Sequence, residues 1–286
     1  MKIAIIVYST YGHIITMAKA VQEGVSKAGY HADLFQVPET LPQDILDQMH
    51  APPKSKDIPI ATLDTLTEYD AFLFGIPTRF GTLPAQFFEF FGATGGLWAQ
   101  GALYGKPAGI FVSTGTQGGG QETTVRNSLN FLAHHGMPYI PLGYAKTFPQ
   151  QSNLEEIHGG SAYGAGTFAS PDGSRQPTEL ELQIATMQGE VFAQSAAKFY
   201  PKDKTSQGKK EASAGDAATA GAAAAPSTGD AKDKTTENKT PTAEKAKEQP
   251  ATQAKDKPTA SAPRANQATK APESEDKSFC SKCIIM

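Results

Sequence analysis

The stretch Ile3-Ala4-Ile5-Ile6-Val7, followed by the loop Ser9-Thr10-Tyr11-Gly12-His13-Ile14, decides the fold of this chain. The first five residues are apolar and mostly β-branched, which is typical of a buried strand in a parallel sheet. Beyond the loop, apolar residues recur at helical spacing as far as Gly29, a residue suited to the end of a helix. The stretch therefore predicts a strand, a hydroxyl-rich loop and a helix, in that order.

A loop between a strand and the first turn of a helix is suited to hold an anion. Its free backbone N–H groups and the positive end of the helix dipole point beyond the end of the strand, which favours a phosphate. The loop Ser9–Ile14 contains no lysine or arginine. We therefore expect amides and hydroxyls to hold the anion, with each charge-assisted hydrogen bond contributing about 1.5–3 kcal/mol.

The composition changes sharply near residue 200. Residues 201–278 contain no Val, Ile, Leu, Met, Phe, Trp, Tyr or Cys, so they cannot bury enough apolar surface to offset the entropy of ordering the chain. We expect a folded domain at residues 1–200, a disordered low-complexity tether at 201–279 and a terminal signal at 280–286. Residues 1–200 carry 11 Lys and Arg against 17 Asp and Glu, a net charge of −6 that argues against nucleic acid as a partner.

The last four residues, Cys283-Ile284-Ile285-Met286, match a prenylation signal of the C-a-a-X type in which Met favours farnesyl. One lipid chain gives only marginal membrane binding, so Cys280 is a candidate for a second, palmitoyl anchor. The two cysteines also form a Cys-x-x-Cys pair, but a redox role would need a surrounding fold to tune the thiols. We expect attachment to the cytoplasmic face of a membrane, most simply the plasma membrane, with no secretory leader and no membrane-spanning run.

Further buried strands are predicted at 33–37, 71–77, 108–113 and 139–142, with helices between them at 43–49, 84–91, 122–133 and 178–199. Strands that alternate with helices indicate an α/β fold with a parallel sheet and helices on both faces. Five strands with a phosphate loop after the first favour the flavodoxin-like order 2-1-3-4-5. Ligands of such folds bind at the carboxyl ends of the strands.

Two more loops at that edge are chemically unusual. The third strand runs into Pro77-Thr78-Arg79-Phe80-Gly81-Thr82, and the fourth runs into the glycine-rich stretch from Ser113 to Glu122. Glycines allow the backbone to approach a flat ligand closely, and Arg79 and Phe80 could flank its plane. A structural ion pair is the alternative role for Arg79.

At this point the chain resembles the tryptophan-repressor-binding-protein family of flavodoxin-like NAD(P)H:quinone oxidoreductases. The resemblance covers residues 1–200, and the long tail resembles that of a fungal branch with a lipidated C-terminus. Thr82 departs from the Asn that is usual in the family, and the fourth-strand loop has an extra residue near Gln117. The motifs that carry the resemblance are 9–14, 77–81, 95–98, 113–121, 133–136 and 164–175.

The resemblance implies FMN-dependent two-electron reduction of quinones by NAD(P)H, with a physiological role in oxidative-stress defence. It implies homodimers or homotetramers whose pockets are completed by neighbouring subunits. It gives catalytic roles to His134, near the flavin, and Trp98, in the quinone pocket, and it associates Tyr11 with NAD(P)H. The implied FMN-binding residues are Ser9, Thr10, Tyr11, Gly12, His13, Ile14, Thr78, Arg79, Phe80, Ser113, Thr114, Gly115, Thr116, Gln117 and Gly118.

Several alternatives stay open from the residues alone. Trp98 could belong to the core, and His134 could simply be a solvated residue at a helix end. The segment 164–169 fits a dinucleotide fingerprint, but no strand is predicted before it, so this match is discarded. The six histidines show no metal-ligand spacing. A membrane-associated scaffold without catalysis is the main competing function, and a one-electron flavodoxin shuttle is a weaker one.

Overall fold

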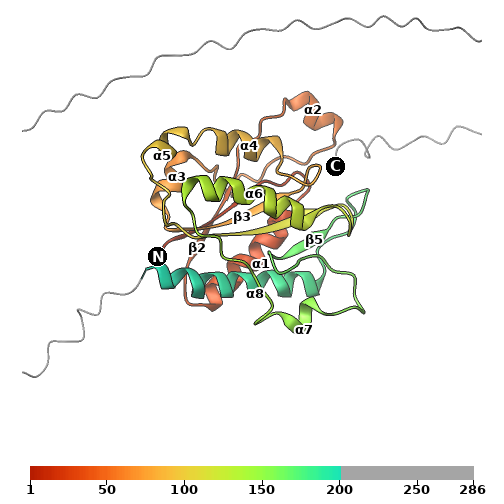
Figure 1. Ribbon diagram of the computed structural model, residues 1–286. Helices are drawn as coiled ribbons and strands as arrows, with labels where there is room; N and C mark the ends of the chain where they lie inside the picture. Colours follow the sequence, from red (N-terminus) through yellow and green to blue (C-terminus); the bar gives the residue numbers. More distant parts are fainter. Residues whose placement is uncertain (201–286) are drawn as a thin grey trace, which may run out of the picture. The chain divides into compact units, whose positions relative to one another are not determined.

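The strand β1 (Ile3–Val7) is buried over all five residues and lies inside the sheet, between two other strands. In the computed structural model, which describes residues 1–200 (Figure 1), it pairs in parallel with β2 (Ala32–Gln36) and β3 (Ala71–Pro77). The sheet continues through β4 (Ala108–Thr114) to β5 (Gly166–Phe168), so the predicted order 2-1-3-4-5 is confirmed. The predicted tether at 201–279 and the signal at 280–286, with Cys280 and Cys283, lie outside the described residues.

The prediction of a fifth strand at residues 139–142 is wrong. Residues 139–142 make only a single bridge to the sheet, between Tyr139 and Ala108, whereas β5 pairs with the carboxyl end of β4. Pro138 and Pro141 flank this bridge, and a proline has no N–H with which to extend a ladder of hydrogen bonds. The chain therefore leaves the sheet and returns to it more than twenty residues later.

A side chain fills the gap between the bridge and β5. Gln188 donates from its amide nitrogen to the carbonyl of Ile110 at 2.8 Å, and its amide oxygen accepts from the N–H of Ala165 at 2.8 Å. These two backbone groups would otherwise be buried without partners, at a cost of about 1–3 kcal/mol each. The buried Gln188 thus completes the hydrogen bonding of the interrupted strand.

Helices cover both faces of the sheet (Figure 1). Alternate residues of each buried strand face opposite layers of helices. Ile3 and Ile5 pack with α1 (His13–Lys27) and α8 (Glu179–Ala196), whereas Ala4 and Ile6 pack in the core on the other face. The helices contributing to this second core are α3 (Leu63–Glu68), α4 (Ala85–Gly92) and α6 (Gln121–His135). The remaining helical segments are α2 (Gln43–Gln48), α5 (Gly95–Ala99), α7 (Phe148–Gln151) and a 3-10 turn (Ala197–Phe199).

The long predicted helices are present with slightly shifted ends, whereas α3, α5 and α7 were not predicted. These three helices span four to six residues, which is too short for a helical period to show in the sequence.

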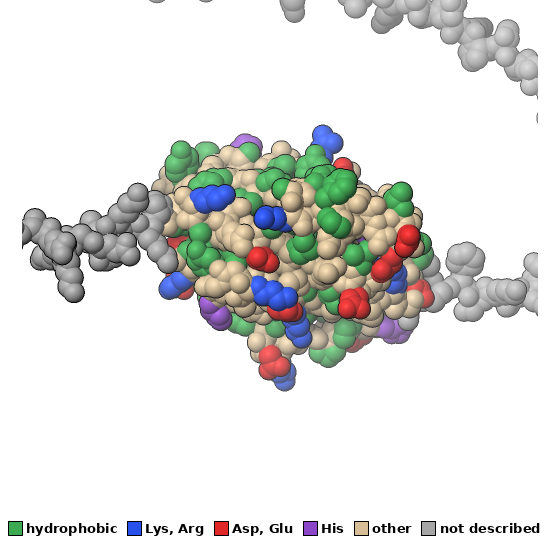
Figure 2. Space-filling view, turned by 90° about the horizontal axis from the view of Figure 1, so that it is seen from below, with side chains coloured by type: hydrophobic (Ala, Val, Ile, Leu, Met, Phe, Trp, Pro, Cys, Tyr) green, Lys and Arg blue, Asp and Glu red, His purple; other side chains and the backbone are tan. Residues whose placement is uncertain are grey.

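The surface seen in Figure 2 carries charged side chains of both signs, interspersed with small groups of hydrophobic ones. No helix within residues 1–200 combines the length and hydropathy that crossing a bilayer requires.

The helices α1 and α8 touch through their backbones at two glycines. A Cβ added at Gly24 would collide with the carbonyl oxygen of Thr186, and one added at Gly189 would collide with the carbonyl oxygen of Val21. Neither obstacle is a flexible side chain, so a larger residue must push the helices apart.

We predict that Gly24→Ala destabilises the fold by about 1–3 kcal/mol or more, as overpacking of a core does. The matched control is Gly92→Ala, at the end of α4, where an added Cβ meets nothing within 4 Å. That change should be neutral or stabilising by up to about 1 kcal/mol, because alanine favours a helix. Urea unfolding measures both; equal stability of the two variants would contradict the close helix contact.

Candidate functional site

A cavity of about 590 Å³ lies at the carboxyl ends of the central strands. Loops from β1, β3 and β4 form its walls, as the strand order predicted. The predicted residues that line it are Ser9, Thr10, Tyr11, His13, Thr78, Arg79, Ser113, Thr114 and Gly115.

The other predicted cofactor-binding residues lie beside the cavity. Gly12 forms the turn into α1, and Ile14 is buried in the core beneath that helix. Phe80 is 93% exposed at a hairpin tip. Residues 116–118 (Thr116, Gln117 and Gly118) are exposed and do not line the cavity.

The loop after β1 has the geometry of an anion cradle. Gly12 adopts a left-handed φ of 93°, and α1 begins at the next residue. The N–H of Gly12 donates to Ser9 Oγ at 3.0 Å, which leaves the hydroxyl hydrogen of Ser9 available to a ligand. The N–H groups in the first turn of α1 have no partner within the helix and open toward the same space.

Two cations from elsewhere in the chain contact this loop, in addition to the amides and hydroxyls that the sequence led us to expect there. Lys54 Nζ donates to the carbonyl of Ser9 at 3.1 Å and pairs with Glu39 at 3.1 Å. Arg79 Nη2 lies 3.5 Å from Thr10 Oγ1. Sequence reasoning missed Lys54 because it lies in a long connection after β2, far from any motif.

Burial shifts the pKa values of the groups next to the loop. It lowers the pKa of the Lys54 ammonium and of the Arg79 guanidinium, and it raises the pKa of the Tyr8 hydroxyl to about 12. Tyr8 therefore stays protonated and donates to both carboxylate oxygens of Glu39, at 3.0 and 3.2 Å. Lys54 also lies 3.9 Å from the centre of the Tyr8 ring, a cation–π contact.

The loops after β3 and β4 lie against each other, as predicted. Arg79 and Thr82 exchange backbone hydrogen bonds across a hairpin whose tip is Phe80 and Gly81. A Cβ added at Gly120 would lie 3.2 Å from the Cα of Gly81, so only glycine allows this approach. Phe80 has a positive φ of 52°, which is uncommon for an aromatic residue and indicates local strain.

Two wall segments were missed by the sequence analysis. Met49 and His50 follow α2, and the hydroxyl of Tyr11 donates to the carbonyl of Met49 at 3.0 Å. Residues 169–174 follow β5 and line the cavity on another side. The second segment belongs to the motif 164–175, which carried part of the family resemblance. The sequence alone did not show that this segment lines the cavity.

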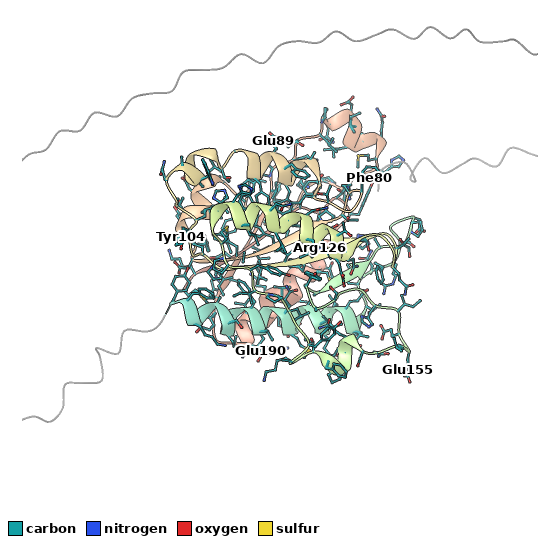
Figure 3. All side chains as sticks on the ribbon, in the orientation of Figure 1. Phe80, Glu89, Tyr104, Arg126, Glu155 and Glu190 are labelled. Atoms are coloured by element: carbon teal, nitrogen blue, oxygen red, sulfur yellow. The ribbon has the colours of Figure 1, made fainter. Side chains whose placement is uncertain are left out.

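Trp98 and His134 lie next to each other, but outside this cavity. Trp98 is 58% exposed and donates from Nε1 to the carbonyl of His134 at 3.0 Å. Both lie near the end of α6, where Gly136 packs closely against Tyr104. Figure 3 shows Tyr104 at one end of the domain and Phe80 at the other. One chain therefore does not bring Trp98 and His134 to the predicted flavin loops.

The neighbouring His135 is buried in an aromatic cluster. Its Nε2 lies 2.9 Å from Thr94 Oγ1, whose hydroxyl also lies 2.6 Å from the carbonyl of Phe91. The carbonyl can only accept, so Thr94 donates to it and His135 Nε2 carries a hydrogen. Burial lowers the pKa of His135, which keeps this ring neutral and structural.

The cavity suits a ligand with an anionic end. The β1 loop supplies hydroxyl groups and free N–H groups at one side, with Lys54 behind it. Thr78, Ser113, Thr114 and Gly115 line the side formed by the loops after β3 and β4. Within residues 1–200, no group of three His, Cys, Asp or Glu side chains is placed to bind a metal ion.

Comparisons with known proteins place the chain in one family. Residues 1–147 match the family described as NADPH-dependent FMN reductase. A protein of Candida albicans named NAD(P)H quinone oxidoreductase YCP4 is 75% identical over 204 residues, which is 71% of each chain. Another from the same organism, NAD(P)H quinone oxidoreductase PST3, is 64% identical over 69% of this chain and 98% of its own. The P25 protein of Schizosaccharomyces pombe is 56% identical over 66% of this chain and 94% of its own.

Proposed function

The chain belongs to the NADPH-dependent FMN reductase family, and we propose that it is an FMN-dependent enzyme that transfers two electrons from NAD(P)H to quinones. Two relatives carry the name NAD(P)H quinone oxidoreductase, at 75% and 64% identity. FMN, when bound, would supply the hydride-transfer and two-electron redox chemistry. The protein supplies the binding groups, the orientation and the electrostatics.

The single observation that carries the proposal is one cavity that joins the anion cradle of the β1 loop to the loops after β3 and β4. Ser9 and Thr10, with the first-turn N–H groups of α1, are placed to hold the phosphate of FMN. Lys54, behind the loop, and Arg79, in the cavity wall, add positive charge. Thr78 and Gly115 lie in the loops that would hold the ring system.

Groups of the chain itself would also assist the reaction. Backbone amides near Gly115 are fixed dipoles that favour negative charge on a reduced ring without reorganising. Thr78 lies at the start of the loop after β3. Its hydroxyl lies 2.5 Å from that of Thr124, which holds the side chain in one orientation. Walls on several sides would exclude water from the reacting face.

We predict that the purified protein binds FMN, is bleached anaerobically by NADH or NADPH, and regains its colour with benzoquinone. Ser9→Ala should weaken FMN binding by about tenfold, because one hydrogen bond to a charged group is lost. The control is Ser26→Ala, on the exposed side of α1. A wild-type protein that fails to take up FMN would overturn the proposal and favour a membrane-associated scaffold.

We further propose that His134 and Trp98 reach the flavin site of a second copy, in a homodimer or homotetramer. Within one chain they lie at the opposite end of the sheet, yet they are exposed and adjacent. In a symmetric assembly, the end of one chain's α6 can lie at the cavity of its neighbour. His134 would then be a hydrogen-bond or proton partner for a quinone oxygen, and Trp98 would line the quinone pocket.

We predict that two inactive variants complement each other. Gly12→Val should abolish FMN binding, because a β-branched residue resists a φ of 93°. His134→Ala should retain FMN but lose activity. Co-expression would restore up to about one quarter of wild-type activity through mixed dimers. Activity no greater than that of the separate variants would exclude a shared site.

We also propose that the enzyme works at the cytoplasmic face of the plasma membrane in oxidative-stress defence. Cys283-Ile284-Ile285-Met286 forms a farnesylation signal, and Cys280 is suited to a palmitoyl chain. Two anchors would hold the enzyme where lipid-soluble quinones reside. Two-electron reduction avoids the semiquinone, which is the reason for the protective role.

We predict that Cys283→Ser moves the full chain from the membrane fraction to the soluble fraction of a fungal cell lysate. Cys280→Ser should give partial release, since a single farnesyl chain binds membranes weakly. Ser281→Ala, between the two cysteines, is the matched control. Unchanged partitioning of Cys283→Ser would refute lipid anchoring at this residue, and FMN-dependent activity should persist in every variant.

A further inference from the structure

The loop at residues 169–174, between β5 and α8, lines the cavity beside the β1 loop. It holds two residues of left-handed conformation, Ser170 at φ 67° and Gly173 at φ 73°. Ser170 is not a glycine, so this conformation is strained and must be imposed by the surroundings. Buried groups next to the loop hold its two ends in place.

Glu181 in the first turn of α8 is the centre of those groups. Its side chain is completely buried and pairs with Arg175 Nη1 at 3.0 Å. It also accepts from the N–H of Gly159 at 2.9 Å, the hydroxyl of Thr167 at 2.8 Å and the N–H of Thr178 at 2.9 Å. A buried carboxylate with this many donors is satisfied and holds its neighbours in one geometry.

Arg175 joins this carboxylate to the rest of the site. Its guanidinium donates to the carbonyl of Phe168 at 2.7 Å and to that of Ile157 at 3.0 Å. Its backbone N–H donates to the carbonyl of Ala169 at 3.0 Å, which closes the loop upon itself. Its own carbonyl lies 2.9 Å from Nε2 of His13. A carbonyl can only accept, so His13 carries its hydrogen on Nε2.

His13 is the first residue of α1 and lines the cavity at the anion cradle. The hydrogen bond from His13 therefore fastens the loop 169–174 to the start of the cradle, across a separation of 162 residues in the chain. Because the loop is tied at one end by Arg175 and at the other by β5, it has little freedom to move away.

We propose that residues 169–174 form a second wall of the flavin phosphate site, and that Arg175 and Glu181 are positioning residues that hold this wall against His13. The inference rests on the proposed function, because the phosphate of FMN is the ligand it invokes. Asp172 accepts from the N–H and hydroxyl of Ser174 at 3.1 and 2.8 Å, so its carboxylate is engaged within the loop's own turn.

The test measures the affinity of the apoprotein for FMN and for riboflavin, which lacks the phosphate, by quenching of flavin fluorescence. Arg175→Lys and Glu181→Gln should weaken FMN binding about tenfold and riboflavin binding by less than about twofold. The matched controls are Arg126→Lys and Glu179→Gln, at exposed residues of α6 and α8. Both controls should bind the two flavins as the wild type does.

His13 provides a variant that leaves the Arg175–Glu181 pair intact. Gln retains a side-chain N–H donor, so His13→Gln should preserve the preference for FMN over riboflavin, and His13→Ala should lose it. This pair of variants carries the test if Glu181→Gln does not fold.

The outcomes separate this inference from the proposed function. Equal losses of FMN and riboflavin affinity in Arg175→Lys would show a general structural role and overturn the positioning role. Unchanged affinity for both flavins would also overturn the positioning role, because neither residue would then affect the site. A wild-type protein that binds neither flavin would overturn the proposed function, and this inference with it.

Discussion

Parallel pairing of β1 with both β2 and β3 is the constraint on which the rest of the structure depends. All the strands then point the same way, and every loop that follows a strand must emerge at one edge. The register places Val7 opposite Gly75, so β1 ends beside β3 and their loops begin at neighbouring points. The site is thus a consequence of topology before any side chain is considered.

The charge arrangement behind the cradle follows from the same geometry. A phosphate needs positive charge, yet a lysine within the tight loop would occupy the space of the ligand. The chain places Lys54 behind the loop, where it reaches the Ser9 carbonyl and not the cavity, and balances it with Glu39. Glu39 is itself held by Tyr8 and Gln86. The cation therefore orients the loop and contributes a field, while the amides and hydroxyls make the direct contacts.

The sequence predicted four of the strands and three of the site's walls because these features are local, and the sheet order followed from the topology that alternating strands and helices adopt. A strand such as Ile3–Val7 shows its burial in its composition, and a loop shows its flexibility in its glycines. Lys54, Met49 and the loop 169–174 were missed because their roles come from contacts between distant parts of the chain. The fifth strand was misplaced because 139–142 has the composition of a strand, whereas its pairing is stopped by flanking prolines and replaced by Gln188.

That misplacement is informative about the site. The interruption lets β5 pair only with the last residues of β4, next to the cavity. It also brings Gly159 to the buried carboxylate of Glu181, and Ile157 to the guanidinium of Arg175. The long excursion of the chain therefore anchors the ion pair that holds the loop after β5 against His13. The sheet edge at β5 departs most from the predicted pattern, because its pairing with β4 is interrupted. The loop that follows this edge strand completes the cavity.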